Sequence, residues 1–180
     1  MKLRYLGTWA KLKITVVPLA VSVGSIGLWI VLVIFAGAVL QLPTGPALVA
    51  SLLCVILHWF SETVHQLGHA RAARRTGYPM IGIRFGTYGI LSTAVYPRDE
   101  VPLPANTHIR RALGGPLFSA WLTCIAFVVL LAIIRSASPA ALFVAWFFFL
   151  ENLFIMTLQV FVPLGFNDGA TIWHWLRQRS

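Results

Sequence analysis

Long apolar stretches separated by short polar turns set the pattern along this chain. A transmembrane helix needs about 20 consecutive apolar residues to cross the hydrocarbon core of a bilayer. Four stretches reach that length, and proline-containing turns follow the first and the third. They cover approximately residues 14–40, 47–68, 113–134 and 140–162. The pattern predicts an all-α membrane protein with about four transmembrane helices, in a single integral membrane domain over residues 1–180.

The polar parts of the chain fall into three segments. Residues 1–13 form a short basic arm, which we expect to lie on the anionic membrane surface. Residues 77–112 form a long loop whose β-branched and aromatic residues, interrupted by glycines, predict two or three short strands. Residues 171–179 predict a short amphipathic helix with Trp173 and Trp175 at the membrane interface. The loop is the one place where β structure is expected.

Composition and charge support this class. Of the residues, 58% are hydrophobic and 11% are charged, whereas about 25% are charged in soluble domains. If both termini are cytoplasmic, every Lys and Arg except Arg135 lies on the cytoplasmic side, as basic residues do in membrane proteins. We therefore expect a multi-pass protein of a prokaryotic cell membrane. The net charge of +9 reflects this topology, so no nucleic-acid partner is expected. Cys54 and Cys124 are interpreted as small core residues.

The second apolar stretch carries a stripe of polar side chains. Their spacing places all of them on one face of a 3.6-residue helix, and ionisable residues inside a span normally face a bundle interior or a wet cavity. The stripe consists of His58, Glu62, His65, Gln66 and His69. Two histidines four residues apart can hold one metal ion. A network of hydrogen bonds between helices, without metal, is the alternative.

Three further side chains bear on this stripe. Asp168 follows the fourth stretch, on the same side as His65 and His69, and is either a third metal ligand or an ordinary turn or cap residue. Glu151 lies near the middle of the fourth stretch, where an unpaired carboxylate is costly, so we expect it to pair with His58. His108 is interpreted as a histidine of the interfacial loop and not as a ligand.

At this point the motifs resemble those of the site-2 protease family of intramembrane zinc metalloproteases. His65-Gln66-Leu67-Gly68-His69-Ala70 is similar to the family's His-Glu-x-Gly-His-Ala, Gly114-Gly115-Pro116-Leu117 to the opening of its next span, and Pro163 to Gly169 to its Pro-x-x-x-x-Asp-Gly motif. The resemblance implies a three-helix core with Zn²⁺ held by His65, His69 and Asp168. It also implies a transmembrane or membrane-anchored protein substrate, positioned by edge pairing with the strand-rich loop.

The chain departs from the family pattern at two positions. Val160 stands where the family often has Asn. More important, Gln66 occupies the position of the general base, which is Glu in zinc hydrolases of this spacing. A carboxamide can orient water but cannot take its proton, and general acid–base catalysis contributes about 10²–10⁴ in rate. Hydrolysis is therefore expected to be absent or strongly impaired.

Glu62 is a candidate substitute base on the same helix face. Side chains of a helix lean toward its N-terminus, however, which directs Glu62 away from the metal. A hydrogen bond to a ligand imidazole or a pair with His58 is more natural for it. Glu151, from the facing helix, is a further candidate base.

Three functional hypotheses follow. The chain is a site-2-protease-like zinc metalloprotease, with Gln66 either an introduced substitution or compensated by another carboxylate. Alternatively, it is a natural pseudoprotease that binds and regulates a membrane protein without cleavage. The third is a metal-binding or transport protein, which the absence of visible internal repeats disfavours. The substrate and the oligomeric state are left open.

Overall fold

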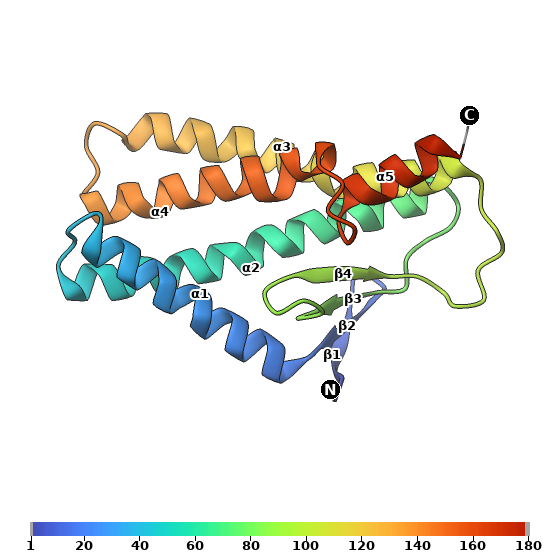
Figure 1. Cartoon of the computed structure of the whole chain (residues 1–180), viewed down its shortest axis with the longest axis horizontal. Helices are drawn as coiled ribbons and strands as arrows, with labels where there is room; N and C mark the ends of the chain where they lie inside the picture. Colours follow the sequence, from blue (N-terminus) through green and yellow to red (C-terminus); the bar gives the residue numbers. More distant parts are fainter. Residues whose placement is uncertain (1, 179–180) are drawn as a thin grey trace.

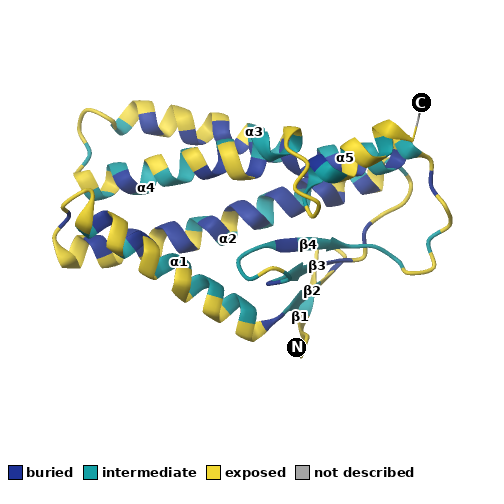
Figure 2. Ribbon diagram, in the orientation of Figure 1, coloured by how far each residue is buried: buried dark blue, intermediate teal, exposed yellow. Residues whose placement is uncertain are grey.

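Four long apolar helices dominate the computed structural model, which describes residues 2–178 (Figure 1). They are α1 (Pro18–Ala38), α2 (Thr44–Arg75), α3 (Ala105–Ile133) and α4 (Pro139–Leu150) with its continuation to Phe161. Each is long and apolar enough to cross a membrane. Large apolar side chains are exposed along their outer faces (Figure 2), as expected where lipid and not water is the solvent. The chain is an integral membrane protein, and the four helices correspond to the four predicted spans, although their ends differ.

A four-stranded sheet lies beside the C-terminal half of α2 (Figure 1). It contains β1 (Arg4–Trp9), β2 (Leu12–Val16), β3 (Gly82–Phe85) and β4 (Ser92–Val95), in that order. β3 and β4 confirm the strands expected in the long loop, and they pair antiparallel. β2 joins β3 in parallel, so that two distant segments of the chain share one sheet.

The position of residues 1–13 at the membrane surface stays a prediction, but residues 4–13 are not a simple arm. They form most of the β1–β2 hairpin, whose turn is made by Ala10 and Lys11, both with positive φ. The first span is also shorter than expected, because residues 14–16 belong to β2 and the helix begins at Pro18. A proline is well placed there, since it lacks the backbone N–H that a first helical turn leaves unpaired.

The last span changes its winding before it ends. α4 continues as a π-helix, Glu151–Thr157, and then as a 3-10 helix, Leu158–Phe161. The following turn leads into α5 (Asp168–Arg177), which lies along the N-terminal part of α3 (Figure 1). α5 thus begins three residues earlier than the tail helix predicted from the sequence. Segments of π-helix occur mostly at functional sites, and this one precedes Asp168.

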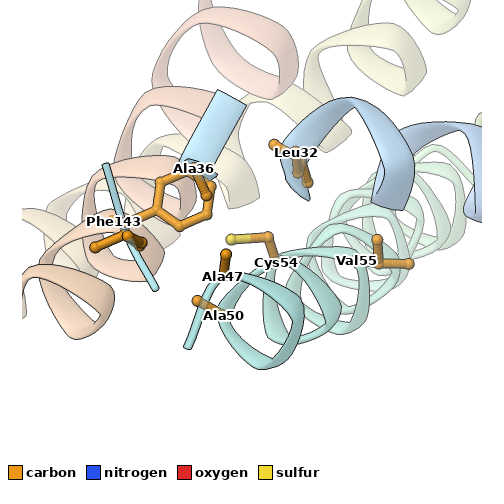
Figure 3. Close-up of a cluster of buried hydrophobic side chains, with 8 residues drawn as sticks. Leu32, Ala36, Ala47, Ala50, Cys54, Val55 and Phe143 are labelled. Atoms are coloured by element: carbon orange, nitrogen blue, oxygen red, sulfur yellow. The ribbon is translucent and has the colours of Figure 1, made fainter. Parts of the chain in front are cut away.

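The spans pack through one apolar cluster and one glycine contact. Leu32, Cys54 and Phe143 lie in a cluster that joins α1, α2 and α4 (Figure 3), which confirms Cys54 as a core residue. Cys124 is exposed on α3, so its assignment to the core is wrong. Gly68 of α2 and Gly114 of α3 touch so closely that a Cβ on either would collide with the other's backbone. This contact brings α3 against the polar stripe, as small residues allow.

Candidate metal centre

His65, His69 and Asp168 meet at one end of the helix bundle. One ligand atom from each lies within 4.8 Å of the other two. His65 Nε2 is 3.0 Å from Asp168 Oδ2, and His69 Nε2 is 3.3 Å from Asp168 Oδ1. The two Nε2 atoms are 3.1 Å apart. The structure therefore places together the three residues that the sequence predicts as metal ligands, although Asp168 follows His65 by 103 positions.

The Nδ1 atom of each imidazole makes a hydrogen bond to α3. His69 Nδ1 donates to the backbone carbonyl of Arg111 at 2.8 Å, and His65 Nδ1 lies 2.9 Å from Ser119 Oγ. A carbonyl only accepts, so this contact places a proton on His69 Nδ1, and Nε2 is then the nitrogen that would bind a metal ion beside Asp168. Such partners are typical of metal-binding histidines, because they fix tautomer and ring orientation.

Asp168 is positioned by the two polar residues of the preceding turn. Gln159 Nε2 donates to Asp168 Oδ2 at 3.1 Å. Asn167 caps α5 by accepting from Ala170 N at 3.0 Å, and its amide nitrogen donates to the Gln159 carbonyl. The pKa of Asp168 is held well below its usual range: burial alone would raise it, but the two adjacent imidazoles favour the carboxylate. Sequence reasoning missed Gln159, because the 3-10 turn that directs it to Asp168 has no clear sequence signal.

Gly115 keeps the space between α3 and the histidines open. A Cβ at this position would run into the imidazoles of both His65 and His69. The neighbouring Pro116 lies inside α3 without ending it. The glycine of the Gly-Pro motif therefore allows the backbone of α3 to approach the imidazoles of His65 and His69 closely.

Gln66 lines the same cavity and is 4% exposed. Its Oε1 has no hydrogen-bond partner within residues 2–178. A buried acceptor without a partner is costly, so it needs a donor such as a water molecule in the cavity. Two imidazoles, one carboxylate and a neighbouring group that needs such a donor fit a zinc site with an open coordination position.

Glu62 makes neither of the two contacts that the sequence suggested. Its Oε2 accepts from the backbone N–H of Ser92 at 2.8 Å and also from the Ser92 hydroxyl. The expected bond to a ligand imidazole or to His58 is thus replaced by a tether to strand β4. Its role as a substitute base stays a prediction, since Glu62 also lines the cavity.

His58 and Glu151 form the expected pair between α2 and the last span. His58 Nδ1 is hydrogen-bonded to Glu151 Oε1, and Nε2 donates to the Ile90 carbonyl at 2.7 Å. Neither residue lines the cavity of the metal ligands. The expectation for His108 is wrong in one respect: it lies in the first turns of α3, not in the loop, stacked on Trp175.

The cavity beside the three ligands has a volume of about 720 Å³. It lies between α2, α3, the last span and strand β4, and residues 91–94, at the start of that strand, form part of its wall. A bundle of membrane helices with a His–His–Asp cluster at one end defines the class of protein as an integral membrane protein with a candidate metal centre.

Comparison with known proteins narrows the fold further. The sequence matches no protein-family model and none of the curated proteins. Among solved structures, the chain is similar to the site-2 protease from Methanocaldococcus jannaschii, with 18% sequence identity and a TM-score of 0.62. The match covers 99% of this chain and 73% of that one. The chain therefore has a site-2-protease-like fold, as the three motifs predict.

Proposed function

We propose that this chain is a site-2-protease-like zinc protein that takes a transmembrane or membrane-anchored protein segment into its cavity, and that Gln66 strongly impairs hydrolysis. The observation that carries the proposal is the His65–His69–Asp168 cluster, with the unpartnered carboxamide oxygen of Gln66 in the same cavity. These three residues would hold the zinc ion, which would act as a Lewis acid on a carbonyl group.

The free edge of β4 supports a protein segment as the occupant of this cavity. The Leu91 and Val95 carbonyls both accept hydrogen bonds on the side of β3. Because backbone groups alternate along a strand, those of Ser92 and Ala94 face the other side. β4 is the last strand of the sheet, so the backbone groups of Ala94 are available to an extended segment. Strand addition would align a peptide beside the metal ligands.

Gln66 sets what this site can do with a bound segment. Its amide can donate to or accept from a water molecule or a substrate carbonyl, and so can orient either. It cannot accept a proton in the working pH range, so the proton of an attacking water has no acceptor at this position. Binding and orientation are retained, whereas proton transfer is lost.

The experiment is proteolysis of a generic single-span substrate in liposomes by the chain as written and by Gln66→Glu, with zinc content measured on both. We expect equal zinc content in the two proteins. The Gln66→Glu variant should cleave the substrate at least about 10²-fold faster than the chain as written. The variant Gln66→Glu/Asp168→Asn is the control and should lose both zinc and activity. Cleavage by the chain as written that Glu62→Gln abolishes would mean that Glu62 is the base and would overturn our assignment of Gln66.

A pseudoprotease is the second candidate, and the carboxamide at position 66 favours it equally. It predicts that neither form cuts, although both hold zinc and both bind the substrate segment in a pull-down from detergent. Absence of bound zinc from both forms, together with no binding of the segment, would contradict both candidates.

We also propose that both termini and the sheet lie on the cytoplasmic side of a prokaryotic cell membrane. The support is the distribution of Lys and Arg, of which only Arg135 lies at the opposite end. Cysteine accessibility at Ser136 and at Arg98 from the two sides of intact cells would test the orientation.

A further inference from the structure

A second pocket lies at the C-terminal end of α2, away from the metal ligands. It has a volume of about 320 Å³ and lies between this helix end and the turn of the β1–β2 hairpin. Leu12, Leu67 and Ala70 form its apolar part, and Ala10, Arg71, Arg74 and Arg75 complete the lining. Leu12 and Ala70 are buried in a common cluster, so the pocket rests on a packed junction between sheet and helix.

The pocket concentrates positive charge. Arg71 and Arg75 are exposed and four residues apart, so they lie on one helix face, where like charges repel. The guanidinium of Arg74 donates to the Ala10 carbonyl, which fixes a third cation at the rim. Within residues 2–178, no ion pair joins any of the three to a carboxylate.

The acidic residues of the chain are committed elsewhere. It has five, and four of them bind other partners: Glu62, Glu100, Glu151 and Asp168. No carboxylate lines the pocket. The positive charge of the pocket is therefore available to an anion from outside the chain.

The depth of the pocket in the membrane indicates which anions surround it. α2 has 32 residues, about 48 Å at 1.5 Å per residue, whereas a bilayer with its headgroups is about 40–45 Å thick. The end of α2 therefore reaches the headgroup layer. Strand β1, next to the pocket, exposes Tyr5, Leu6 and Trp9, residues suited to that layer.

We propose that this pocket binds a phosphate group, and that the headgroup of an anionic phospholipid supplies it. Arginine forks bind phosphate through paired N–H···O bonds, and the pocket offers two free forks beside a fixed one. The bound headgroup would join α2 to the β1–β2 hairpin at the membrane surface. It would thereby hold the whole sheet, including β4, at a constant depth.

The test is retention of phosphatidylglycerol by the purified full chain in neutral detergent, measured by native mass spectrometry against phosphatidylcholine. The variant Arg71→Gln/Arg75→Gln should lose affinity for phosphatidylglycerol by roughly tenfold or more, since each basic residue near a membrane surface contributes about a fivefold factor. The matched control is Arg98→Gln/Arg110→Gln, which removes the same charge at two exposed positions outside the pocket. It should retain the lipid as the unaltered chain does.

A second arm separates the two sources of phosphate. Inorganic phosphate is added at constant ionic strength, and thermal unfolding is followed by circular dichroism. If phosphate raises the melting temperature as phosphatidylglycerol does, and the pocket variant abolishes this rise, the site is confirmed with a soluble ligand. Equal loss of lipid in both double variants, or no loss in the pocket variant, overturns the proposal. Should the double variant unfold, the single variants Arg71→Gln and Arg75→Gln give the same comparison.

Discussion

Glu62 binds Ser92, and this contact ties the helix of the metal ligands to the edge strand of the sheet. The Glu62 carboxylate accepts from both the backbone N–H and the hydroxyl of Ser92, and Glu62 is only 4% exposed. Glu62 lies about one helical turn before His65. The tether therefore holds the free edge of β4 at a fixed position relative to the ligands, and it occupies the Ser92 N–H that a paired segment would otherwise use.

Replacement of Glu62 by Ala should release β4. Two buried donors of Ser92 would lose their acceptor, which costs about 1–3 kcal/mol for each unsatisfied group. Hydrogen exchange measured by mass spectrometry should accelerate over residues 91–96, with exchange in α3 unchanged. Ser92→Ala is the control, since it removes the hydroxyl but keeps the bond from the backbone N–H. Unchanged exchange over β4 in Glu62→Ala would show that the contact does not hold the strand.

His58 and Glu151 should be energetically coupled. Removing one partner leaves the other polar group unpaired inside the membrane, so each single variant, His58→Ala or Glu151→Ala, should be destabilised by about 3–5 kcal/mol. The double variant should be less destabilised than the sum of the two, with a coupling energy of about 0.5–3 kcal/mol. The stability of all four proteins of this double-mutant cycle is measured by thermal unfolding in the same detergent. Strictly additive losses would contradict the pairing.

Gly115→Ala should disturb the candidate metal site without replacing any of the three candidate ligands. The added Cβ collides with both ligand imidazoles, so zinc affinity should fall roughly 10–100-fold, as it does when the groups supporting a ligand are changed. Gly27→Ala in α1 is the matched control, because no atom lies within 4 Å of its added Cβ. Equal zinc affinity of the two variants in a chelator titration would mean that the imidazoles do not occupy these positions.

Gln159→Ala should also weaken zinc binding, by about tenfold or more. The variant removes the donor to Asp168 Oδ2 and leaves the ligand itself in place. Val160→Ala, the next residue along the same 3-10 turn, is the control and should bind zinc normally. A Gln159→Ala chain with unchanged zinc affinity and unchanged melting temperature would contradict a positioning role.

The Glu100–Arg111 pair should give a pH-dependent contribution to stability. Arg111 donates to both carboxylate oxygens, at 2.8 and 2.5 Å, and its guanidinium holds the pKa of Glu100 below the usual value. A lowered pKa means that the contribution is present above the ordinary Glu pKa of about 4.3 and is lost as the pH falls through the native pKa. The melting temperature of Glu100→Gln should therefore be lower than that of the unaltered chain at pH 7. The difference should shrink toward pH 3, and a constant difference would contradict the pair.

Much of the site could be predicted because its signals are local. The period of a helix places His65 and His69 on one face, and the lengths of the apolar stretches predict the spans. The glycines of the Gly-Pro motif predict close helix contact, which the Gly68–Gly114 approach confirms. The substitution at Gln66 is likewise evident from the motif alone, since it replaces one member of a short pattern.

Tertiary structure decided the contacts between distant segments. Strand β2 pairs with β3 because its backbone groups find partners about 70 residues away, and no local pattern specifies that. The tether of Glu62 to Ser92, the winding that brings Gln159 to Asp168, and the arginine pocket depend in the same way on the packing of separate elements. The sequence by itself determined a membrane bundle with two histidines on one helix face, spaced as metal ligands are. Only the fold brought Asp168 to them and a free strand edge to the cavity, because those positions depend on long-range packing and not on periodicity.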